Sequence, residues 1–472
     1  MDGRRITADP RPCNVRRVVV KKRQRGGGGD GFVNSVKKIQ KREICSKKGR
    51  AFRLCDVQER FRNIWLQEEY DTHDPKGHSS TVLPFLKKRS KIIEIVAAHG
   101  TVFALAQSGV CAAFSRETNK RICFLNISPD EVIRSLFYNK NNDSLITVSV
   151  YAADSFSSLK CRTTKIEYIK RGQPDAGFPL FESESLKWPG FVEFDDVNGK
   201  VLTFSAQDSI YKVFDLKNYI MLYSIPDKNV QEIKISPGIM LLIFNKSSGH
   251  VPLKILSIED GTVLKSFNHL LHRNKKVEFI EQFNEKLLVK QENENLQILD
   301  VRNSELIEVN KTEFMTPSAF IFLYDNQLFL TFRNRTVAVW NFRGQLVTSF
   351  EDHLLWHPDC NTNIIHITSG QDLIISYCKS DSDDPLTDEN AGSINISNIL
   401  TGKCLAKVKA TNHLPTDDCS CSNNARCKCN SRRQISTSVT EALEDITALF
   451  FDEERNEIYT GNKFGLIHVW SN

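Results

Sequence analysis

Four cysteines in the last quarter of the chain have the spacing best suited to chemistry. They form two Cys-x-Cys pairs, Cys419 with Cys421 and Cys427 with Cys429, inside a polar segment from 411 to 440. Four thiolates at such spacing can surround a zinc ion. Zinc sites more often use Cys-x-x-Cys, and the two pairs make a tighter loop than that. We therefore expect a reduced loop inserted between repeats, with zinc binding as the alternative.

The cysteines elsewhere are mostly isolated within apolar segments. A reduced thiol in such a position packs as a small hydrophobic side chain. We expect structural roles for Cys111, Cys123, Cys161, Cys378 and Cys404.

A second polar segment is acidic. It contains Asp381, Asp383 and Asp384, followed by Asp388 and Glu389. Carboxylates in series can bind calcium, but the glycine and the twelfth-position glutamate of a calcium loop are not in register. The segment is therefore predicted to be a solvated hairpin tip.

Motifs of known enzyme classes do not occur in the sequence. The glycine-rich run from Gly26 to Gly31 is not followed by Lys-Ser or Lys-Thr, so it does not predict a phosphate loop. Neither His-Glu-x-x-His nor Gly-x-Ser-x-Gly is present. Sequence motifs do not detect a site assembled from several loops. We expect a protein without catalytic residues, cofactor or resident metal.

The basic residues are concentrated at the N-terminus. Residues 1–50 hold sixteen Lys or Arg against four acidic residues, a net charge of +12 in a chain whose total is +6. This segment has too little apolar content to fold alone, so a disordered basic tail is predicted over residues 1–54. Its densest clusters fit a nuclear import signal or a phosphate-binding arm, with a merely solvated tail as the alternative. The residues concerned are Arg16, Arg17, Lys21, Lys22, Arg23 and Arg25.

The rest of the chain is built on a repeat of strand, turn and strand. Each copy begins at an apolar residue, and the residue twelve positions later is large and apolar. The residues nine and eleven positions after the first are also apolar, and this alternation is that of a strand. Looser copies near Leu145, Ile239 and Leu373 bring the number to eight. A spacing of 41 residues, as between Leu287 and Leu328, is that of a four-stranded propeller blade. The clear copies are Ile458 to Trp470, Leu328 to Trp340, Leu287 to Leu299, Leu202 to Phe214 and Val102 to Phe114.

The ends of these copies resemble the Trp-Asp ending of WD-repeat proteins. Val339-Trp340-Asn341, Val213-Phe214-Asp215 and Val469-Trp470-Ser471 carry the likeness, and the chain looks most like a plant-type WD-repeat protein of the transducin-like group. The resemblance implies an all-β fold: one β-propeller over residues 79–472, with eight blades favoured and seven possible. It also implies a role in binding other proteins.

Two endings resemble a more specific motif. WD-repeat substrate receptors of cullin-type ubiquitin ligases dock through Trp-Asp-x-Arg. Here Trp340-Asn341-Phe342-Arg343 and Leu299-Asp300-Val301-Arg302 each keep the arginine and differ at one other position. The resemblance implies possible adaptor docking by Asp300, Arg302, Trp340 and Arg343.

The N-terminal side must also complete the last blade. The final repeat shows only three strands, which leaves an open sheet edge. Thr81–Phe85 is the predicted fourth strand, beside either Ile446–Phe451 or Leu466–Trp470. Residues 55–78 are predicted to be a linker with a short helix, because Val57, Phe61, Ile64 and Trp65 share one helical face. That face is expected to pack on the propeller, with a docking role as the alternative.

These features together predict a non-enzymatic scaffold that binds other proteins in the nucleus, and possibly also in the cytoplasm. The alternatives are a substrate receptor of a ubiquitin ligase and a nucleic-acid-associated factor acting through the basic tail. No apolar run approaches the length of about 18 residues that spans a membrane, and no signal peptide is evident, so a soluble intracellular protein is expected.

Overall fold

The computed structural model contains two compact units, Met1–Arg53 and Leu54–Asn472, and every described residue belongs to the second. The basic cluster from Arg16 to Arg25, the acidic segment from Asp381 to Glu389 and the four paired cysteines lie outside the described residues. The described residues are 60–73, 89–183, 192–205, 210–226, 229–245, 249–272, 275–317, 319–333, 336–350, 364–378, 391–410 and 437–472.

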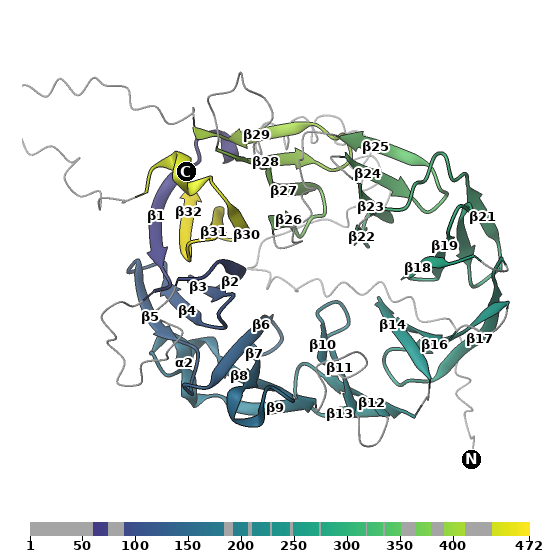
Figure 1. Cartoon of the computed structure of the whole chain (residues 1–472), viewed down its shortest axis with the longest axis horizontal. Coiled ribbons are helices and arrows are strands. Elements are labelled where there is room, and N and C mark those ends of the chain that lie inside the picture. Colours follow the sequence, from purple (N-terminus) through teal and green to yellow (C-terminus); the bar gives the residue numbers. More distant parts are fainter. Residues whose placement is uncertain are drawn as a thin grey trace, which may run out of the picture. The chain divides into compact units, whose positions relative to one another are not determined.

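The second unit is an eight-bladed β-propeller (Figure 1). Its strands form eight four-stranded sheets in which neighbours pair antiparallel. The predicted all-β fold is thereby confirmed, with eight blades and not seven. We number the blades 1 to 8 along the chain and the strands of each blade from the centre outwards. Blade 1 contains β2 (Ile92–Ala98), β3 (Thr101–Ala106), β4 (Cys111–Ser115) and β5 (Lys120–Phe124), and blade 2 contains β6 (Glu131–Asn139), β7 (Ser144–Tyr151), β8 (Leu159–Lys165) and β9 (Phe178–Ser183). Blade 3 contains β10 (Val192–Asp195), β11 (Lys200–Ser205), β12 (Ile210–Asp215) and β13 (Met221–Ile225), and blade 4 contains β14 (Val230–Ser236), β15 (Ile239–Phe244), β16 (His250–Ser257) and β17 (Val263–Leu270).

The second half of the ring repeats the same order, and helix is confined to short turns between strands. Those with described bounds are η2 (Ala152–Asp154), α2 (Ile166–Lys170), η3 (Pro174–Ala176) and α3 (Val439–Ala442), and residues 60–62 before β1 are also helical. Blade 5 contains β18 (Val277–Phe283), β19 (Lys286–Gln291), β20 (Leu296–Asp300) and β21 (Leu306–Val309), and blade 6 contains β22 (Ala319–Leu323), β23 (Leu328–Arg333), β24 (Thr336–Asn341) and β25 (Leu346–Phe350). Blade 7 contains β26 (Ile365–Ile367), β27 (Leu373–Cys378), β28 (Ser393–Asn398) and β29 (Cys404–Val408), and blade 8 contains β30 (Ile446–Asp452), β31 (Glu457–Asn462), β32 (Leu466–Ser471) and β1 (Trp65–Asp71).

Blade 8 is completed by a strand from the other end of the unit. β1 pairs with β32, so that Tyr70 lies opposite Ile467 and Asp71 opposite Leu466 (Figure 1). An N-terminal strand was predicted beside either Ile446–Phe451 or Leu466–Trp470; the structure places one beside Leu466–Trp470, but from a different segment. The predicted segment, Thr81–Phe85, lies outside the described residues, and β1 holds the edge.

The residues before β1 correct the predicted helix. Only residues 60–62 are helical in this described stretch, and Trp65 opens β1 with 49% of its surface exposed. Phe61 and Ile64 are buried among residues of blades 7 and 8, as a packing role requires. Short helices are marginal in water, whereas an open sheet edge offers a full set of hydrogen bonds. The edge of β32 therefore takes Trp65 to Asp71 as a strand.

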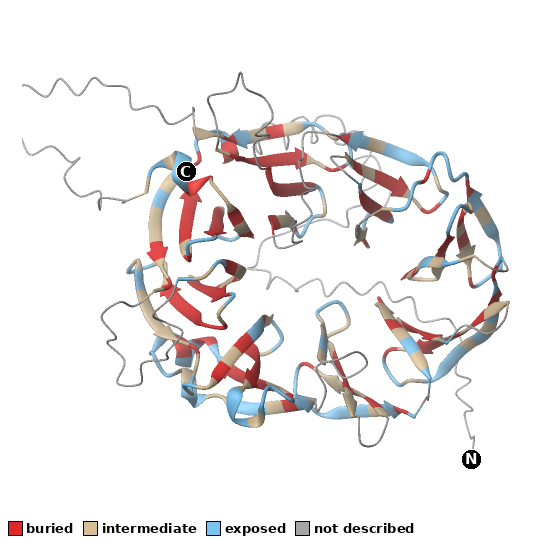
Figure 2. Ribbon diagram, viewed as in Figure 1, coloured by how far each residue is buried: buried red, intermediate tan, exposed pale blue. Residues whose placement is uncertain are grey.

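The core lies between neighbouring blades. Every residue of β31 is buried, because both of its faces meet another blade, and Figure 2 shows buried residues in red within the other blades as well, mixed with partly exposed ones in tan. Trp470 has no exposed surface, and its indole Nε1 donates to Thr460 Oγ1 at 2.8 Å. Trp340 repeats this arrangement with Thr331 at 3.0 Å. The large apolar residue that ends the repeat is therefore buried in three of the clear copies, as Phe114, Trp340 and Trp470, and partly buried as Phe214 and Leu299 in the other two.

Candidate functional site

A polar residue at the end of the third strand shapes the turn to the fourth strand. Asp300 Oδ1 accepts a hydrogen bond from the backbone N–H of Arg302 at 2.9 Å, and Asn341 Oδ1 accepts one from Arg343 at the same distance. Ser115 has the same role in blade 1. A carboxylate, amide or hydroxyl oxygen can make this local bond, so Asp, Asn and Ser are interchangeable here. The varied endings of the repeats follow from this chemistry.

Asp300 is engaged within its own blade. Its Oδ2 also accepts a hydrogen bond from Lys286 Nζ at 2.6 Å. Burial raises the pKa of Asp300, but these two hydrogen bonds lower it by more, so the pKa lies below its ordinary value. Arg302 is 69% exposed and forms an ion pair with Glu285, which lies in the turn between the first two strands. Asp300 is thus a turn residue, and Arg302 is an exposed, paired cation.

Arg343 of blade 6 has different surroundings from Arg302 of blade 5. Trp340 is buried and bonded to Thr331, so it presents no surface to a partner. Arg343 is exposed, and among the described residues no carboxylate pairs with its guanidinium. Its backbone is held because Asn341 also accepts from the N–H of Gln345 at 3.0 Å.

The four predicted docking residues therefore do not form one site. The structure places Arg302 and Arg343 in equivalent turns of neighbouring blades, on the same face of the ring, because each follows the third strand of its blade. Asp300 stabilises a turn, and Trp340 is a core residue.

An apolar surface runs along the outer strands of blades 3 to 6. Four residues at equivalent register are 48–56% exposed: Met221 opposite Phe214, Val263 opposite Leu256, Leu306 opposite Leu299 and Leu346 opposite Trp340. Leu222, Leu264 and Val347 stand next to three of them and are also exposed. These outer strands appear largely pale blue in Figure 2. We call the seven residues the apolar rim.

The outer strands of the other four blades differ from β13 and β25, which contain no charged residue and no proline. Each carries charged residues or proline: Lys120 and Arg121 in β5, Pro179 and Glu182 in β9, Lys407 in β29, and Glu68, Glu69 and Asp71 in β1. Such residues keep sheet edges from associating. The apolar rim was not found from the sequence, because the twelve-residue frame covers the second and third strands only. Paired apolar residues a few positions after each frame were the available signal.

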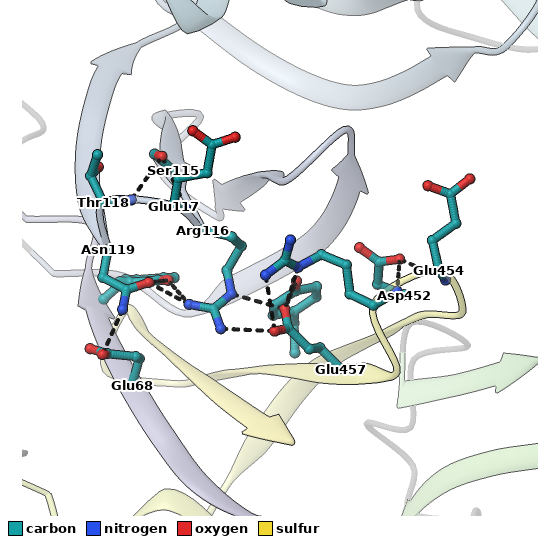
Figure 3. A network of polar contacts seen from close by, with 12 residues as sticks. Glu68, Ser115, Arg116, Glu117, Thr118, Asn119, Asp452, Glu454 and Glu457 are labelled. Atoms are coloured by element: carbon teal, nitrogen blue, oxygen red, sulfur yellow. Dashed lines mark hydrogen bonds and ion pairs between the residues drawn. The ribbon is translucent and has the colours of Figure 1, made fainter. Parts of the chain in front are cut away.

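A buried polar network joins blade 8 to blade 1 (Figure 3). The Arg116 guanidinium donates from Nε and Nη2 to the two carboxylate oxygens of Glu457, both at 2.9 Å, and only 7% and 8% of these side chains is exposed. Arg116 Nη1 also donates to the Tyr70 hydroxyl at 2.7 Å, which ties β1 into the network. Tyr459 and Arg455 add hydrogen bonds to Glu457 at 2.6 and 3.0 Å. This site was not predicted.

The charges in this network are mutually stabilised. Burial raises the pKa of Glu457, but hydrogen bonds from Arg116, Arg455 and Tyr459 outweigh it and lower the pKa to about 2. Burial lowers the pKa of Arg116, and its bonds to Glu457 and Tyr70 raise it by more. Burial raises the pKa of Tyr459, and the bond to Glu457 adds to this effect. At neutral pH the carboxylate is therefore an acceptor, and the tyrosine and both arginines are donors.

The isolated cysteines have the predicted positions. Cys111, Cys161 and Cys378 are buried within strands, Cys123 and Cys404 are half-buried, and all five are free thiols. Burial raises the pKa of Cys123 and of Cys161 to about 12, so both remain protonated.

Two kinds of feature are absent from the described residues. They contain no group of three or more His, Cys, Asp or Glu placed to hold a metal ion. None of their helices has the length and apolar character to cross a membrane.

The fold and the exposed turns define an eight-bladed β-propeller protein. The family model described as "Domain of unknown function (DUF7899)" matches residues 49–470, and the chain belongs to this family. No curated protein matches the sequence. The WD-repeat and plant-type character expected from the sequence stays a prediction.

Solved structures resemble the chain at low sequence identity. The computationally designed Ika8 protein is 17% identical with a TM-score of 0.46, over 81% of this chain and 97% of its own. BamB from Moraxella catarrhalis is 10% identical with a TM-score of 0.40, over 87% of this chain and 98% of its own.

Proposed function

We propose that this propeller is a non-enzymatic scaffold that binds other proteins in the nucleus. The apolar rim is the observation that supports the proposal best. Exposed apolar patches that recur at one register in consecutive blades are costly in water, and on soluble proteins they mark interaction surfaces. The basic clusters between Arg16 and Arg25 supply the proposed import signal.

The closed ring supports a scaffold role physically. Each blade is buried against its neighbours, so the outer strands are held on a rigid frame, and little ordering entropy is lost when a partner binds. The four equivalent rim positions can contact one extended partner or several smaller ones.

The test compares two sets of four substitutions. The rim variant carries Met221→Ser, Val263→Ser, Leu306→Ser and Leu346→Ser. The control variant carries Ile127→Ser, Val197→Ser, Leu400→Ser and Phe464→Ser, which are also exposed apolar residues but lie outside the four rim strands. Quantitative affinity purification from nuclei should show proteins that are retained by the wild type and the control and lost by the rim variant. An identical partner set for all three would refute the proposal.

A substrate receptor of a cullin-type ubiquitin ligase is the second candidate. The exposed Arg343 guanidinium, without a carboxylate partner in the described part of the chain, supports it. Arginine binds carboxylates in bidentate geometry, and loss of a desolvated pair costs about 2–5 kcal/mol. Co-purification of the ligase adaptor should then be abolished by Arg343→Ala. Arg302→Ala should have less effect, because an exposed pair such as Arg302 with Glu285 contributes under about 1 kcal/mol.

A further inference from the structure

Two outer strands of the apolar rim lack the charged residues and prolines that prevent sheet edges from associating. β13, with the sequence MLYSI, and β25, with the sequence LVTSF, contain no charged residue and no proline. The other two rim strands each carry a charge, Lys265 in β17 and Glu308 in β21. An outer strand has a row of backbone N–H and C=O groups on its free side, and an unguarded one is a template for another strand.

β25 combines this edge with an available cation. Leu346 and Val347 open the strand and are 51% and 44% exposed, and Arg343 lies three residues before Leu346. The turn that carries Arg343 is fixed, because Gly344 donates its N–H to the Asn341 carbonyl at 3.1 Å and Asn341 receives the N–H of Gln345. The guanidinium therefore projects from a defined point beside the start of β25.

We propose that β25 pairs with an extended segment of a protein partner, which becomes a fifth strand of blade 6. The proposal rests on the scaffold function and specifies its partner. The segment would be about five residues long, to match β25, with apolar side chains that cover Leu346 and Val347. An aspartate or glutamate at the end near Arg343 would complete the contact, because a guanidinium and a carboxylate form a bidentate pair.

The charge requirement argues against the chain's own N-terminal segment as the occupant. Residues 1–50 carry a net charge of +12, which repels the Arg343 cation. β13 is the other unguarded edge, and the nearest cation in its turn is Lys217, which lacks the bidentate geometry of arginine. β25 is therefore favoured over β13 as the edge that pairs with a segment carrying apolar residues and a carboxylate.

The experiment uses a phage-displayed library of random twelve-residue peptides, selected on the full-length protein. Enriched peptides should contain adjacent apolar residues with an Asp or Glu at one end. One enriched peptide is then synthesised with a fluorophore, and its binding is measured by fluorescence anisotropy. Leu346→Ser with Val347→Ser, and separately Arg343→Ala, should each weaken binding by about tenfold or more. The matched control, Val263→Ser with Leu264→Ser on β17, should bind as the wild type does.

A second peptide tests backbone pairing directly. N-methylation of alternate residues removes the N–H donors on one edge, so binding should fall by about tenfold or more if the peptide is a strand. Unchanged binding of the methylated peptide, equal binding by the Leu346/Val347 variant, or failure to enrich any peptide would each overturn the proposal. So would sedimentation showing a dimer that the same variant dissociates, because the occupant would then be a second copy. None of these results affects the scaffold test, which fails only if the four-residue rim variant keeps every partner.

Discussion

The guanidinium of Arg116 in blade 1 and the carboxylate of Glu457 in blade 8 form a buried bidentate ion pair between residues 341 positions apart. Arg116 follows the third strand of its blade. The residue at this position in blades 2 to 7 is buried and apolar: Ile166, Leu216, Ile258, Val301, Phe342 and Ile399. The joint where the two ends of the ring meet thus has a polar pair at this position beside its apolar core, while at the joint of blades 6 and 7 Leu328 and Ile399 belong to one apolar cluster.

Removal of one member of this pair should destabilise the protein strongly. Arg116→Met leaves the Glu457 carboxylate buried with Arg455 as its one remaining cation in the network, and Glu457→Gln leaves a buried guanidinium, so each should cost about 3–5 kcal/mol. The double variant should cost clearly less than the two single changes together, because neither charge is left uncompensated. Urea denaturation of all four proteins measures the coupling. Additive costs would show that the two charges act independently.

The same pair predicts a dependence on pH. The pKa of folded Glu457 is about 2, below its ordinary value of 4.5, so folding favours the ionised form. This stabilisation is complete above the ordinary pKa and is lost as pH falls from there through the folded pKa. The wild type should exceed Glu457→Gln in urea midpoint by a constant margin between about pH 7 and pH 5, and by less near about pH 3. A margin that does not shrink in acid would contradict this assignment.

Trp470→Ala should destabilise blade 8. Its indole is fully buried and donates to Thr460, so truncation creates a cavity and removes a buried hydrogen bond. The expected cost is about 3–5 kcal/mol. Trp65→Ala is the control, because Trp65 is 49% exposed and should cost little. A melting temperature unaffected by the Trp470 change would show that the residue is not part of the core.

β1 should be essential for the stability of the propeller, whereas residues 1–53 should not be. Deletion of residues 1–53 should leave the melting temperature unchanged, because Leu54–Asn472 is a separate compact unit. Deletion of residues 1–72 removes β1 and Tyr70, which stacks on Phe114 at 4.9 Å, and opens the edge of β32. We expect a markedly lower melting temperature and aggregation. Equal stability of the two deletions would mean that β1 does not close the ring.

Nuclear residence should depend on the basic segment. Replacement of Lys21, Lys22, Arg23 and Arg25 with alanine removes its densest cluster. A fluorescent fusion should then shift towards the cytoplasm, since a chain of 53.8 kDa equilibrates slowly without active import. The fusion lacking residues 1–50 should shift at least as far. A nuclear signal that persists in both would reject the import role.

The number of blades was predictable because each blade buries its second and third strands on both sides. Burial selects apolar residues at fixed spacing, and the resulting frame from Leu328 to Trp340 or from Ile458 to Trp470 is visible without any structure. The ends of the frame were less informative. A polar residue there caps a turn, so Asn341 and Asp300 resembled a docking motif for a local reason.

The sequence by itself determined the strand repeat, favoured eight blades over seven and identified the large apolar residues that end the frames, of which Phe114, Trp340 and Trp470 are buried. The tertiary structure decided three other features: β1 as the closing strand, the partnership of Arg116 with Glu457, and the alignment of Met221, Val263, Leu306 and Leu346 on one rim. The first two depend on contacts between residues distant in the chain, and such contacts leave no periodic pattern. The rim residues recur at about the spacing of the blades, but only the structure shows that they are exposed. An arginine in a turn or an apolar residue in an outer strand has the same local sequence whether it faces water or a neighbouring blade.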